Sequence, residues 1–489
     1  MEPSQSSRPS AFAPGPADPR YCCGTLTYTK PGLFRLFGFL LWGDFCFSFM
    51  EVVWGSVLLL VLKSHGASNT VISVVLTIIP YVMNAILNPI ISTASDRYRS
   101  KRGRRIPFLL FSAPFISFFL ILMGFSNELG ALLYPWIGGL SPVITKAGVT
   151  IGLICVLIVS FRFFELFVAT VFWYLFNDVV PEAFMGRFLG MFRVISALAG
   201  VLFNYFILQY AESHTREIFL GAGILYGLGF LLLSLNVKEG SYPPPEKMSQ
   251  KKGFSLEVVA TFFRECFSHR IYRLVFLNSL TNGMAGAISG FSLFMMMSLG
   301  LTLADIGKVA ALSGVVGMVL LYPMGTLADR FHPLRIVLPA QTAFALVTAV
   351  SCIFLFVNFS REGAFWIVAL LSATTAVVLA ANTAALLPMY MHIFPRERFG
   401  QFCAANAMCG SIGLVVAGAL GGLFLDVLKK VFSSRGDYYY RFVPVWSFLF
   451  LAFAAFALWL VFKEWKRLGG IRGYVPPGSS MKPKEPLIS

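Results

Sequence analysis

Twelve long apolar runs, separated by short polar loops, constrain the fold of this 489-residue chain more than any other feature. A helix of about 20 apolar residues spans the hydrocarbon core of a bilayer. The chain is 57% hydrophobic and 13% charged, whereas soluble proteins carry about 25% charged residues. We therefore predict an all-α polytopic membrane protein.

The predicted spans form two sets of six. The first six are expected at 34–62, 70–94, 106–125, 148–175, 187–210 and 217–237. The second six are expected at 272–299, 305–328, 336–358, 363–391, 399–425 and 442–462. One further apolar stretch, 131–144, is short and interrupted by Pro and Gly. We expect it to lie at the outer surface of the membrane and not to cross it.

The loops differ in charge from one side to the other. Loop 95–105 carries six Lys or Arg residues within nine positions, and loops of this kind stay in the cytoplasm. The basic loops 238–270, 329–335 and 392–398 then lie on the same side, together with both termini. The outer loop 426–441, with four basic and two acidic residues, is an exception. The expected location is the plasma (inner) membrane, with both termini in the cytoplasm.

The long loop in the middle of the chain divides it into two halves. The expected organisation is a disordered, Pro- and Ser-rich cytoplasmic tail, a six-helix bundle, a cytoplasmic linker, a second six-helix bundle and a second cytoplasmic tail. These parts are assigned to residues 1–33, 34–237, 238–270, 271–463 and 464–489, respectively.

Two internal repeats support the division. The Asp96-Arg97 pair recurs as Asp329-Arg330, each time after the second helix of a half. A Pro, a Gly and a Phe recur in the same spacing before the fifth helix of each half, as Pro181, Gly186 and Phe188 and as Pro395, Gly400 and Phe402. The repeats indicate two homologous, pseudo-symmetric six-helix halves. This is the architecture of the major facilitator superfamily, whose halves rock around a central site.

Five ionisable residues lie deep within the predicted spans of the first half. An ionisable residue at the bilayer centre costs about 2.5–3.5 kcal/mol on insertion scales, so each needs a partner or a water-filled cavity. The five are Asp44, Glu51, Arg162, Glu165 and Arg193. We expect proton or cation coupling to involve this group.

The spacing of these charged residues indicates which of them share a helix face and which can pair. Asp44 and Glu51 are seven residues apart and share a helix face. Glu51 has no basic residue within a turn, which favours a coupling role over a structural one; for Asp44 both roles stay open. Arg162 and Glu165 are three residues apart and can pair within one helix, for structure or for function. Arg193 could reach either acid if the helices adjoin.

Neutral polar and aromatic residues are candidates for the solute cavity. The second half has no deep charge, so solute contacts there are expected from Asn278, Asn282, Asn382 and Asn406. In the first half Asn84 and Asn88 lie four residues apart and either line the cavity or bond a neighbouring helix. Trp54, Trp173 and Tyr174 could stack on a sugar ring, although aromatic belts at the membrane interface also explain such residues.

Several function classes are not expected. The eight Cys and five His residues have no metal-ligand or triad spacing, so we predict no metal, no cofactor, no disulfide framework and no enzyme. The net charge of +16 resides in loops and tails, which positive-inside bias explains without a nucleic-acid partner. The expected partners are a small-molecule solute, protons and membrane lipid, with the chain acting as a monomer.

Three motifs resemble a known group of transporters. The loop SDRYRSKRGRRIPF resembles the signature of the sucrose:proton symporters, their animal relatives and the glycoside–pentoside–hexuronide:cation symporters. The first helix, GDFCFSFMEVVWGSVLLLVLKSHG, is similar to that of the sucrose-symporter relatives and places Glu51 where they carry a glutamate. NDVVPEAFMGRFLGMFR resembles their fourth-to-fifth helix junction. The resemblance covers roughly the first 200 residues, and the second half matches only at superfamily level through LADRF.

The resemblance implies a sugar carrier driven by a cation gradient. The melibiose-type permeases carry aspartates where Asn84 and Asn88 stand here. Asparagine cannot supply the net negative charge of a sodium site, so sodium coupling is not expected. Proton coupling through Glu51 or Asp44 and uncoupled facilitated diffusion both stay open. So does transport of a muropeptide, nucleoside or lysolipid, because one scaffold hosts many functions. A non-transporting membrane sensor is the least favoured alternative.

The basic loops also predict a cytoplasmic gate. We expect Asp96 to pair with Arg97 and Arg104, mirrored by Asp329 with Arg330, across the interface of the halves when the inner side is shut. The expected gate contains further residues of the same motifs, namely Arg105, Asp178 and Arg187. The alternative is that these charges set only the topology.

Overall fold

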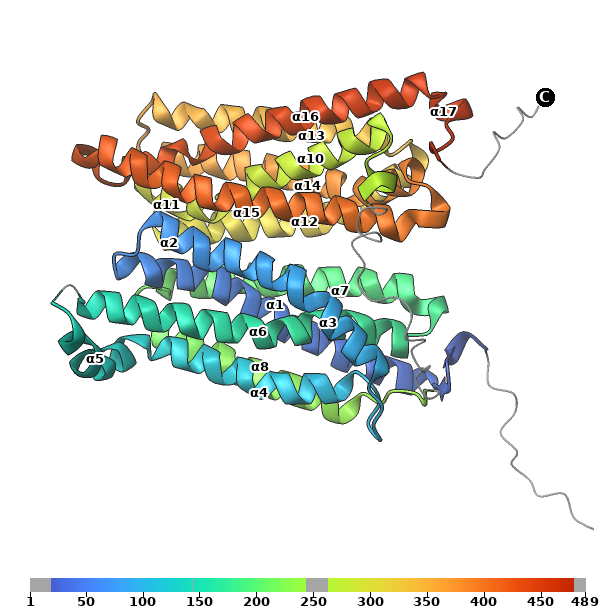
Figure 1. Cartoon of the computed structure of the whole chain (residues 1–489), viewed down its shortest axis with the longest axis horizontal. Coiled ribbons are helices and arrows are strands. Elements are labelled where there is room, and N and C mark those ends of the chain that lie inside the picture. The colour runs from blue at the N-terminus through green and yellow to red at the C-terminus, as the bar shows by residue number, and fades with distance from the viewer. Residues whose placement is uncertain (1–18, 143, 243–262, 479–489) are drawn as a thin grey trace, which may run out of the picture.

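A computed structural model describes residues 19–142, 144–242 and 263–478. Within these residues twelve helices are long and apolar enough to cross a membrane. They form two bundles, and in Figure 1 the first half of the chain, coloured blue to green, lies beneath the second half, coloured yellow to red. The predicted all-α, twelve-helix membrane fold is confirmed.

The first half begins with α1, a single long helix, and each predicted span overlaps one of its helices or one run of consecutive helices. The bounds are α1 Lys30–Ser64, α2 Asn69–Ser73, η2 Val74–Ile78, α3 Ile79–Arg97, α4 Ile106–Gly124, α5 Ser126–Ile137, η3 Gly138–Leu140, α6 Lys146–Val179, α7 Glu182–Leu202, η4 Phe203–Ile207, η5 Leu208–Tyr210 and α8 Thr215–Asn236. The segments α2, η2 and α3 follow one another without a break and together form one span.

The second half repeats this pattern of six spans. Its bounds are α10 Arg270–Gly286, η6 Ser289–Phe291, α11 Ser292–Ser298, α12 Leu303–Arg330, α13 Leu334–Ser351, η7 Cys352–Leu355, α14 Arg361–Ile393, η8 Arg396–Arg398, α15 Phe399–Val431, η9 Ser433–Phe442, α16 Val443–Arg467 and α17 Gly470–Gly473. The helices of one half pack on one another, as α10 does on α15 and α16.

Side-chain caps fix where several of these helices begin. Thr29 accepts a hydrogen bond from the backbone N–H of Gly32 at the start of α1. Thr145 caps α6 and Ser360 caps α14 in the same way. Such caps satisfy backbone donors that the first turn of a helix leaves free.

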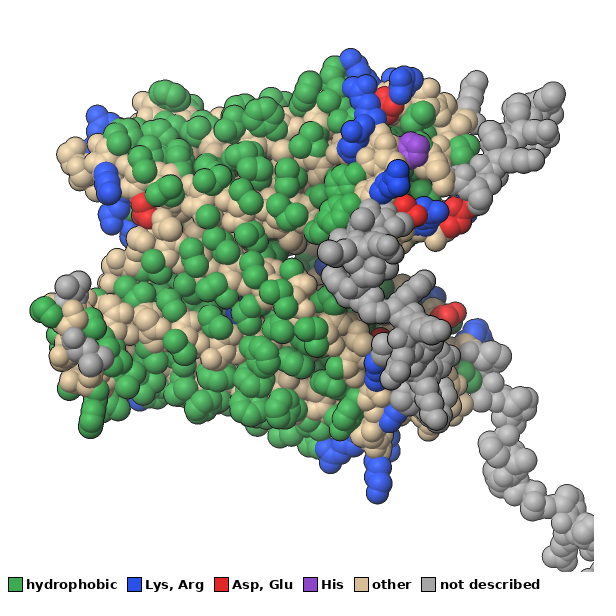
Figure 2. Space-filling view, in the orientation of Figure 1, with side chains coloured by type: hydrophobic (Ala, Val, Ile, Leu, Met, Phe, Trp, Pro, Cys, Tyr) green, Lys and Arg blue, Asp and Glu red, His purple; other side chains and the backbone are tan. Residues whose placement is uncertain are grey.

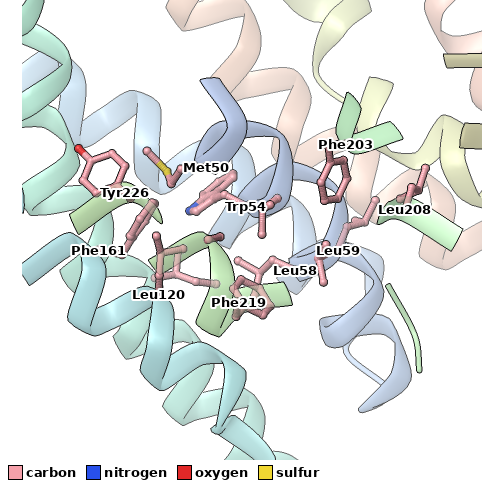
Figure 3. Close-up of a cluster of buried hydrophobic side chains, with 14 of the residues drawn as sticks. Met50, Trp54, Leu58, Leu59, Leu120, Phe161, Phe203, Leu208, Phe219 and Tyr226 are labelled. Atoms are coloured by element: carbon pink, nitrogen blue, oxygen red, sulfur yellow. The ribbon is translucent and has the colours of Figure 1, made fainter. Parts of the chain in front are cut away.

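The core of the first half surrounds α1. Met50 and Trp54 of α1, Phe161 of α6 and Tyr226 of α8 lie close to one another in Figure 3. All four are buried. Glu51 follows Met50 in α1, so it lies next to this core.

Two segments are more ordered than the sequence suggests. The disorder expected for 1–33 does not extend to residues 19–33, because β1 (Cys22–Cys23) and β2 (Leu26–Thr27) pair as an antiparallel hairpin, and residues 1–18 lie outside the described part. The ring of Tyr21 packs against Phe184, which fixes the hairpin to α7. After α17, Tyr474 donates a hydrogen bond to the Ile393 carbonyl, so the start of the expected C-terminal tail is folded too.

The two ends of the molecule differ in charge. Loop 98–105 and both described chain ends lie at one end, which we call the basic end, and α5 lies at the opposite, far end (Figure 1). Figure 2 shows Lys and Arg side chains gathered at the basic end, with a smaller group at the far end. The halves pack on each other through α2 and η2 against α15, and through η4 and η5 against α12.

Loop 426–441, whose basic charge is unexpected for its predicted side of the membrane, lies at the far end (Figure 1). Arg441 donates hydrogen bonds to the backbone carbonyls of Phe354 and Ser298 and to the side chain of Asn358. Lys429 and Lys430 lie in the last turn of α15, where the helix dipole favours cations. These features account for three of the four basic residues in this loop.

Candidate functional site

One arginine lies between two carboxylates in the first half. Nη1 of Arg162 is 3.4 Å from Oε1 of Glu51 and 3.2 Å from Oε2 of Glu165. Arg162 and Glu165 come from α6 and Glu51 from α1, so the group joins two helices. The Glu51 side chain is 38% exposed, whereas that of Glu165 is only 4% exposed. We call these three residues the charged trio.

An aromatic ring supports the arginine. The guanidinium of Arg162 lies over the Trp54 ring, 4.8 Å from its centroid, and Trp54 in turn stacks on Phe161. A cation over an indole face gains about 0.5–2 kcal/mol, more when it is desolvated. Among the described residues, Nε of Arg162 and Nε1 of Trp54 have no hydrogen-bond acceptor. Two buried donors next to the trio thus have no acceptor within the described part of the structure.

Asp44 lies apart from the trio although it shares a helix with Glu51. Its side chain is buried and accepts hydrogen bonds from Ser196 of α7 at 2.8 Å and from Ser48 at 3.4 Å. These hydroxyls partly replace the water that the carboxylate loses on burial. Asp44 therefore connects α1 to α7.

Arg193 projects from α7 toward the aromatic side chains of α6. It is exposed, and its guanidinium lies over the Trp173 ring, 6.0 Å from the centroid. Trp173 also contacts Phe192. Arg193 thus has an aromatic neighbour and also lies near enough to Asp44 for the two charges to attract each other.

A cavity of about 490 Å³ opens beside the charged trio. Its walls come from α1, α3 and α6 and combine hydrogen-bonding groups with aromatic rings. The polar and aromatic lining residues are Glu51, Arg162, Glu165, Asn84, Asn88, Thr170, Trp54, Tyr81, Trp173 and Tyr174. Small-molecule sites typically have volumes of about 300–1,000 Å³, so the cavity is large enough for a sugar-sized solute.

The two amides of α3 both face this cavity. Asn84 and Asn88 line it, and Oδ1 of Asn88 accepts a hydrogen bond of 3.0 Å from Thr170 of α6. Asn88 therefore both lines the cavity and bonds a neighbouring helix, the two roles that the sequence left open for it.

A second cavity of about 710 Å³ lies between the halves. It shares Asn84 and Asn88 with the first cavity and extends along α3 to α15, where Ala407 and Ser411 form its other wall. The two hollows are thus adjacent, and together they reach from the charged trio to the second half.

The asparagines expected to contact solute in the second half have mostly helix-packing roles. Asn278 is buried and donates to the Ala454 carbonyl at 2.8 Å. Asn282 accepts from Gln341 of α13, and Asn406 accepts from Ser279. None of the three is among the residues that line the two cavities. Asn382 of α14 has a buried Oδ1 that no described residue bonds.

The charges of loop 98–105 pair within the first half. In this structure Asp96 pairs with Arg105, whereas its expected pairing with Arg97 and Arg104 concerns the form that is shut at this end. Arg104 binds Asp178 at the end of α6 through Nε at 2.9 Å, and Arg105 reaches the same carboxylate at 3.1 Å. The network fixes the basic ends of α3, α4 and α6 together.

Three further members of the expected gate lie on the surface. Arg97 ends α3, Arg187 lies in α7 and Arg330 ends α12, and all three are exposed. Asp329 lies in α12, but its side chain is outside the described part of the structure. The pairing across the halves therefore stays a prediction.

Sequence reasoning missed Glu239, the residue that completes the basic-end network. Its carboxylate accepts hydrogen bonds from the backbone N–H groups of Arg104, Arg105 and Ile106, at 2.9, 2.8 and 2.6 Å. Glu239 lies three residues after the end of α8, and an acid at the start of a basic linker carries no sequence signal for this contact. Among the described residues, no three His, Cys, Asp or Glu side chains come together as a metal site.

Comparison with known proteins identifies the fold. The sequence model of the Major Facilitator Superfamily matches the chain twice, over residues 40–350 and 275–484. No curated protein matches it in sequence.

Solved structures of transporters are similar in fold. An inward-facing, occupied bacterial homologue of the human lysosomal transporter Spinster has a TM-score of 0.65 at 14% identity, covering 90% of this chain and 99% of that one. A mutant of the nucleoside transporter NupG has a TM-score of 0.63 at 10% identity, covering 87% and 100%. The inward-open xylose transporter XylE from E. coli has a TM-score of 0.56 at 13% identity, covering 87% and 96%. At these identities the likeness concerns the fold alone.

Proposed function

Because the chain belongs to the Major Facilitator Superfamily, we propose that it carries a neutral, hydroxyl-rich solute, a sugar or glycoside, through the central cavity by alternating access. The main support for this proposal is the composition of the cavity wall. Indole and phenol rings of Trp54, Trp173 and Tyr174 stand beside the amides of Asn84 and Asn88. Aromatic faces suit the apolar faces of a sugar ring, and amides bond its hydroxyls.

The charged trio supports proton coupling. Glu51 is the exposed acid of the trio and lines the cavity, so a proton can reach it from water. Protonation would end its attraction to Arg162, which would then interact with Glu165 alone and turn free donors toward the solute. The trio thereby offers a physical link between proton binding and solute binding. Asp44, held by serine hydroxyls, is the second candidate for the coupling acid.

The charge distribution and the apolar outer surface also support an orientation of the protein in the membrane. We place the basic end in the cytoplasm of a plasma (inner) membrane, following positive-inside bias. The chain is proposed to act as a monomer, with lipid around its apolar outer surface. The packing of the halves near the far end supports a conformation that is open toward the cytoplasm.

Uptake into proteoliposomes tests the proposal. Purified protein is reconstituted and supplied with a panel of labelled mono- and disaccharides, with a nucleoside and a lysolipid as competing candidates. Each is measured with and without an inward proton gradient. We expect saturable uptake of at least one sugar, stimulated by the gradient.

Each possible result of the uptake assay supports a different transport function. Equal sugar uptake with and without the gradient would indicate a uniporter, and uptake of only the nucleoside or lysolipid would replace the sugar. The matched control for substitutions at Glu51 is Glu128→Gln, which neutralises an exposed acid of the far end outside the cavity. Loss of uptake in both Glu51→Gln and Glu128→Gln would mean that the effect of the Glu51 substitution is not specific.

A further inference from the structure

Asp426 joins the two halves at the far end. It lies near the end of α15 in the second half. Its Oδ1 accepts hydrogen bonds from the backbone N–H of Asn69 at 2.9 Å and from Nδ2 of the same residue at 2.8 Å. Its Oδ2 accepts from the backbone N–H of Thr70 at 2.9 Å and from the hydroxyl of Thr70 at 2.6 Å. One carboxylate of the second half thus accepts four hydrogen bonds from the first.

A lysine makes the reciprocal contact. Nζ of Lys63, at the end of α1, donates to the hydroxyls of Tyr439 and Tyr440 at 2.8 and 2.7 Å. The ammonium also lies 4.7 Å from the centroid of the Tyr440 ring. Tyr440 in turn donates to Oδ1 of Asn69 at 2.8 Å, which links this contact to that of Asp426. We call Lys63, Asn69, Thr70, Asp426, Tyr439 and Tyr440 the far-end contact.

Glycines allow the helices to meet closely at this place. A Cβ atom on Gly422, one turn before Asp426, would lie 2.7 Å from Cα of Thr70. A Cβ atom on Gly307 of α12 would lie 2.1 Å from the carbonyl oxygen of Asn204, on the other side of the interface. Backbone meets backbone at both positions, so solute cannot pass between the helices there.

The far-end contact is stable only while the halves touch. If the far end opened, Asp426 and Lys63 would exchange these partners for water. Hydrogen bonds to an ionised group are roughly twice as strong as neutral ones. Neutralising Asp426 or Lys63 should therefore weaken the closed far end more than removing an uncharged hydrogen-bond partner would.

We propose that the far-end contact is the gate that closes the cavity at this end, and that Asp426 and Lys63 set the balance between the two open conformations. The proposal rests on the alternating access proposed above. It assigns a role to Asp426 at the start of loop 426–441 and to Tyr439 and Tyr440 near the end of that loop. Asp426→Asn removes the charge and turns an amide N–H group toward other donors, and Lys63→Met removes the ammonium.

Thiol labelling tests the gate. A reporter cysteine is introduced as Ser411→Cys, which lies in the cavity between the halves, in a full-length chain whose eight native cysteines are replaced. Right-side-out and inverted membrane vesicles are treated with a membrane-impermeant maleimide, so that each end is probed separately. We expect Asp426→Asn and Lys63→Met to raise the labelling rate from the far-end side about tenfold, equivalent to about 1.4 kcal/mol, and to lower it from the basic-end side.

The matched control breaks an ion pair at the same end within one half. Asp305 binds Arg361 at 2.7 Å, and both belong to the second half. Asp305→Asn should leave both labelling rates unchanged. Unchanged labelling in Asp426→Asn and Lys63→Met, or an equal change in Asp305→Asn, would overturn the gate.

The readout separates this gate from the proposed function. Labelling needs no transported solute, so a shift in labelling with no sugar uptake by the parent protein would support the gate and contradict the sugar carrier. A general loss of folding would raise labelling from both sides, which the opposite shifts expected here exclude.

Discussion

The charged trio shows how a membrane protein keeps ionised groups within an apolar helix bundle. Glu51 and Glu165 share the one guanidinium of Arg162, and Trp54 covers the face of the cation. Burial of unpaired charge is costly, so the arginine compensates whichever acid is ionised. The cavity supplies water to Glu51, the more exposed of the two acids.

Removal of the shared cation should damage both stability and transport. Arg162→Gln leaves Glu51 and Glu165 without a counter-charge. Breaking a buried ion pair costs about 3–5 kcal/mol, an upper value here because the cavity exposes Glu51 in part. We expect a lower thermal unfolding temperature in detergent and loss of uptake.

The control for this substitution is Arg216→Gln. Arg216 pairs with Glu128 at 3.7 Å, and both side chains are exposed. Exposed pairs contribute about 0–1 kcal/mol, so this variant should unfold and transport like the parent. Equal behaviour of Arg162→Gln and the parent would contradict the role of the trio.

A histidine at the basic end predicts a dependence of stability on pH. His332 precedes α13, and its Nδ1 accepts from the Leu334 backbone N–H, while its ring packs on Trp465. Burial, followed by the charges of His392 and Arg335, lowers the pKa of His332 to about 4. The unfolded value is about 6.5, so the folded state binds fewer protons below that pH and loses stability as the pH falls from 6.5 toward 4.

Thermal unfolding between pH 7 and pH 5 checks this prediction. The unfolding temperature should fall with pH in the parent and fall less in His332→Asn, which keeps a side-chain acceptor for Leu334. His214→Asn, an exposed histidine of the far end, serves as the control and should follow the parent. A decline in His332→Asn as steep as in the parent would rule out His332 as the source.

Some of the individual site residues could be predicted from the sequence. Glu51, Arg162 and Glu165 stand out in the sequence because charge is rare in apolar spans. The Glu51–Arg162 contact could not be predicted, since it depends on how α1 packs against α6. Asn278 was expected to contact solute, but it donates to the backbone carbonyl of Ala454. An amide within a span can bond a neighbouring helix as readily as it can face a cavity, and the sequence does not distinguish the two.

At the scale of helices, the start of α4 depends on an acid distant in sequence. Glu239 accepts from three successive backbone N–H groups there, which also places negative charge at the positive end of the helix dipole. Glu239→Ala should lower the free energy of unfolding by about 0.5–2 kcal/mol, the range for loss of a helix cap.

Chemical denaturation measures this effect. Glu239→Gln keeps an acceptor oxygen and should lose less stability than Glu239→Ala. Glu212→Ala, in an exposed loop at the far end, should be neutral. The cap would be refuted if Glu239→Ala and Glu212→Ala unfolded at the same denaturant concentration.

Close helix packing gives a second prediction at this scale. A Cβ atom on Gly413 of α15 would lie 2.1 Å from the Leu280 carbonyl oxygen of α10. Gly413→Ala must therefore push these helices apart, and overpacking of this kind costs about 1–3 kcal/mol. Gly400, on the same helix, has open space at its Cβ position, so Gly400→Ala should leave the unfolding temperature unchanged. A neutral Gly413→Ala would contradict the packing described.

The helices themselves could be predicted far better than the segments that flank them. Length and hydropathy indicate each span because the bilayer demands both. The hairpin of residues 22–27 could not be predicted, since its two strands have only two residues each and it is held by contacts such as that of Tyr21 with Phe184.

At the scale of the whole molecule, the two halves enclose a cavity that is polar on one side only. Asn84 and Asn88 lie where its two parts adjoin, and the far-end contact joins the halves beyond it. The internal repeats in the sequence predict the two halves. They cannot predict which end is closed, because that depends on contacts such as Asp426 with Thr70 that form between the halves.

The most direct test of the central claim separates exchange from accumulation in Glu51→Gln. In proteoliposomes, the parent should accumulate a labelled sugar above its external concentration when an inward proton gradient is imposed. Glu51→Gln should still exchange internal for external sugar but should not accumulate it, because its side chain binds no proton. Accumulation by Glu51→Gln equal to that of the parent, or no entry of any sugar into parent vesicles, would contradict the account.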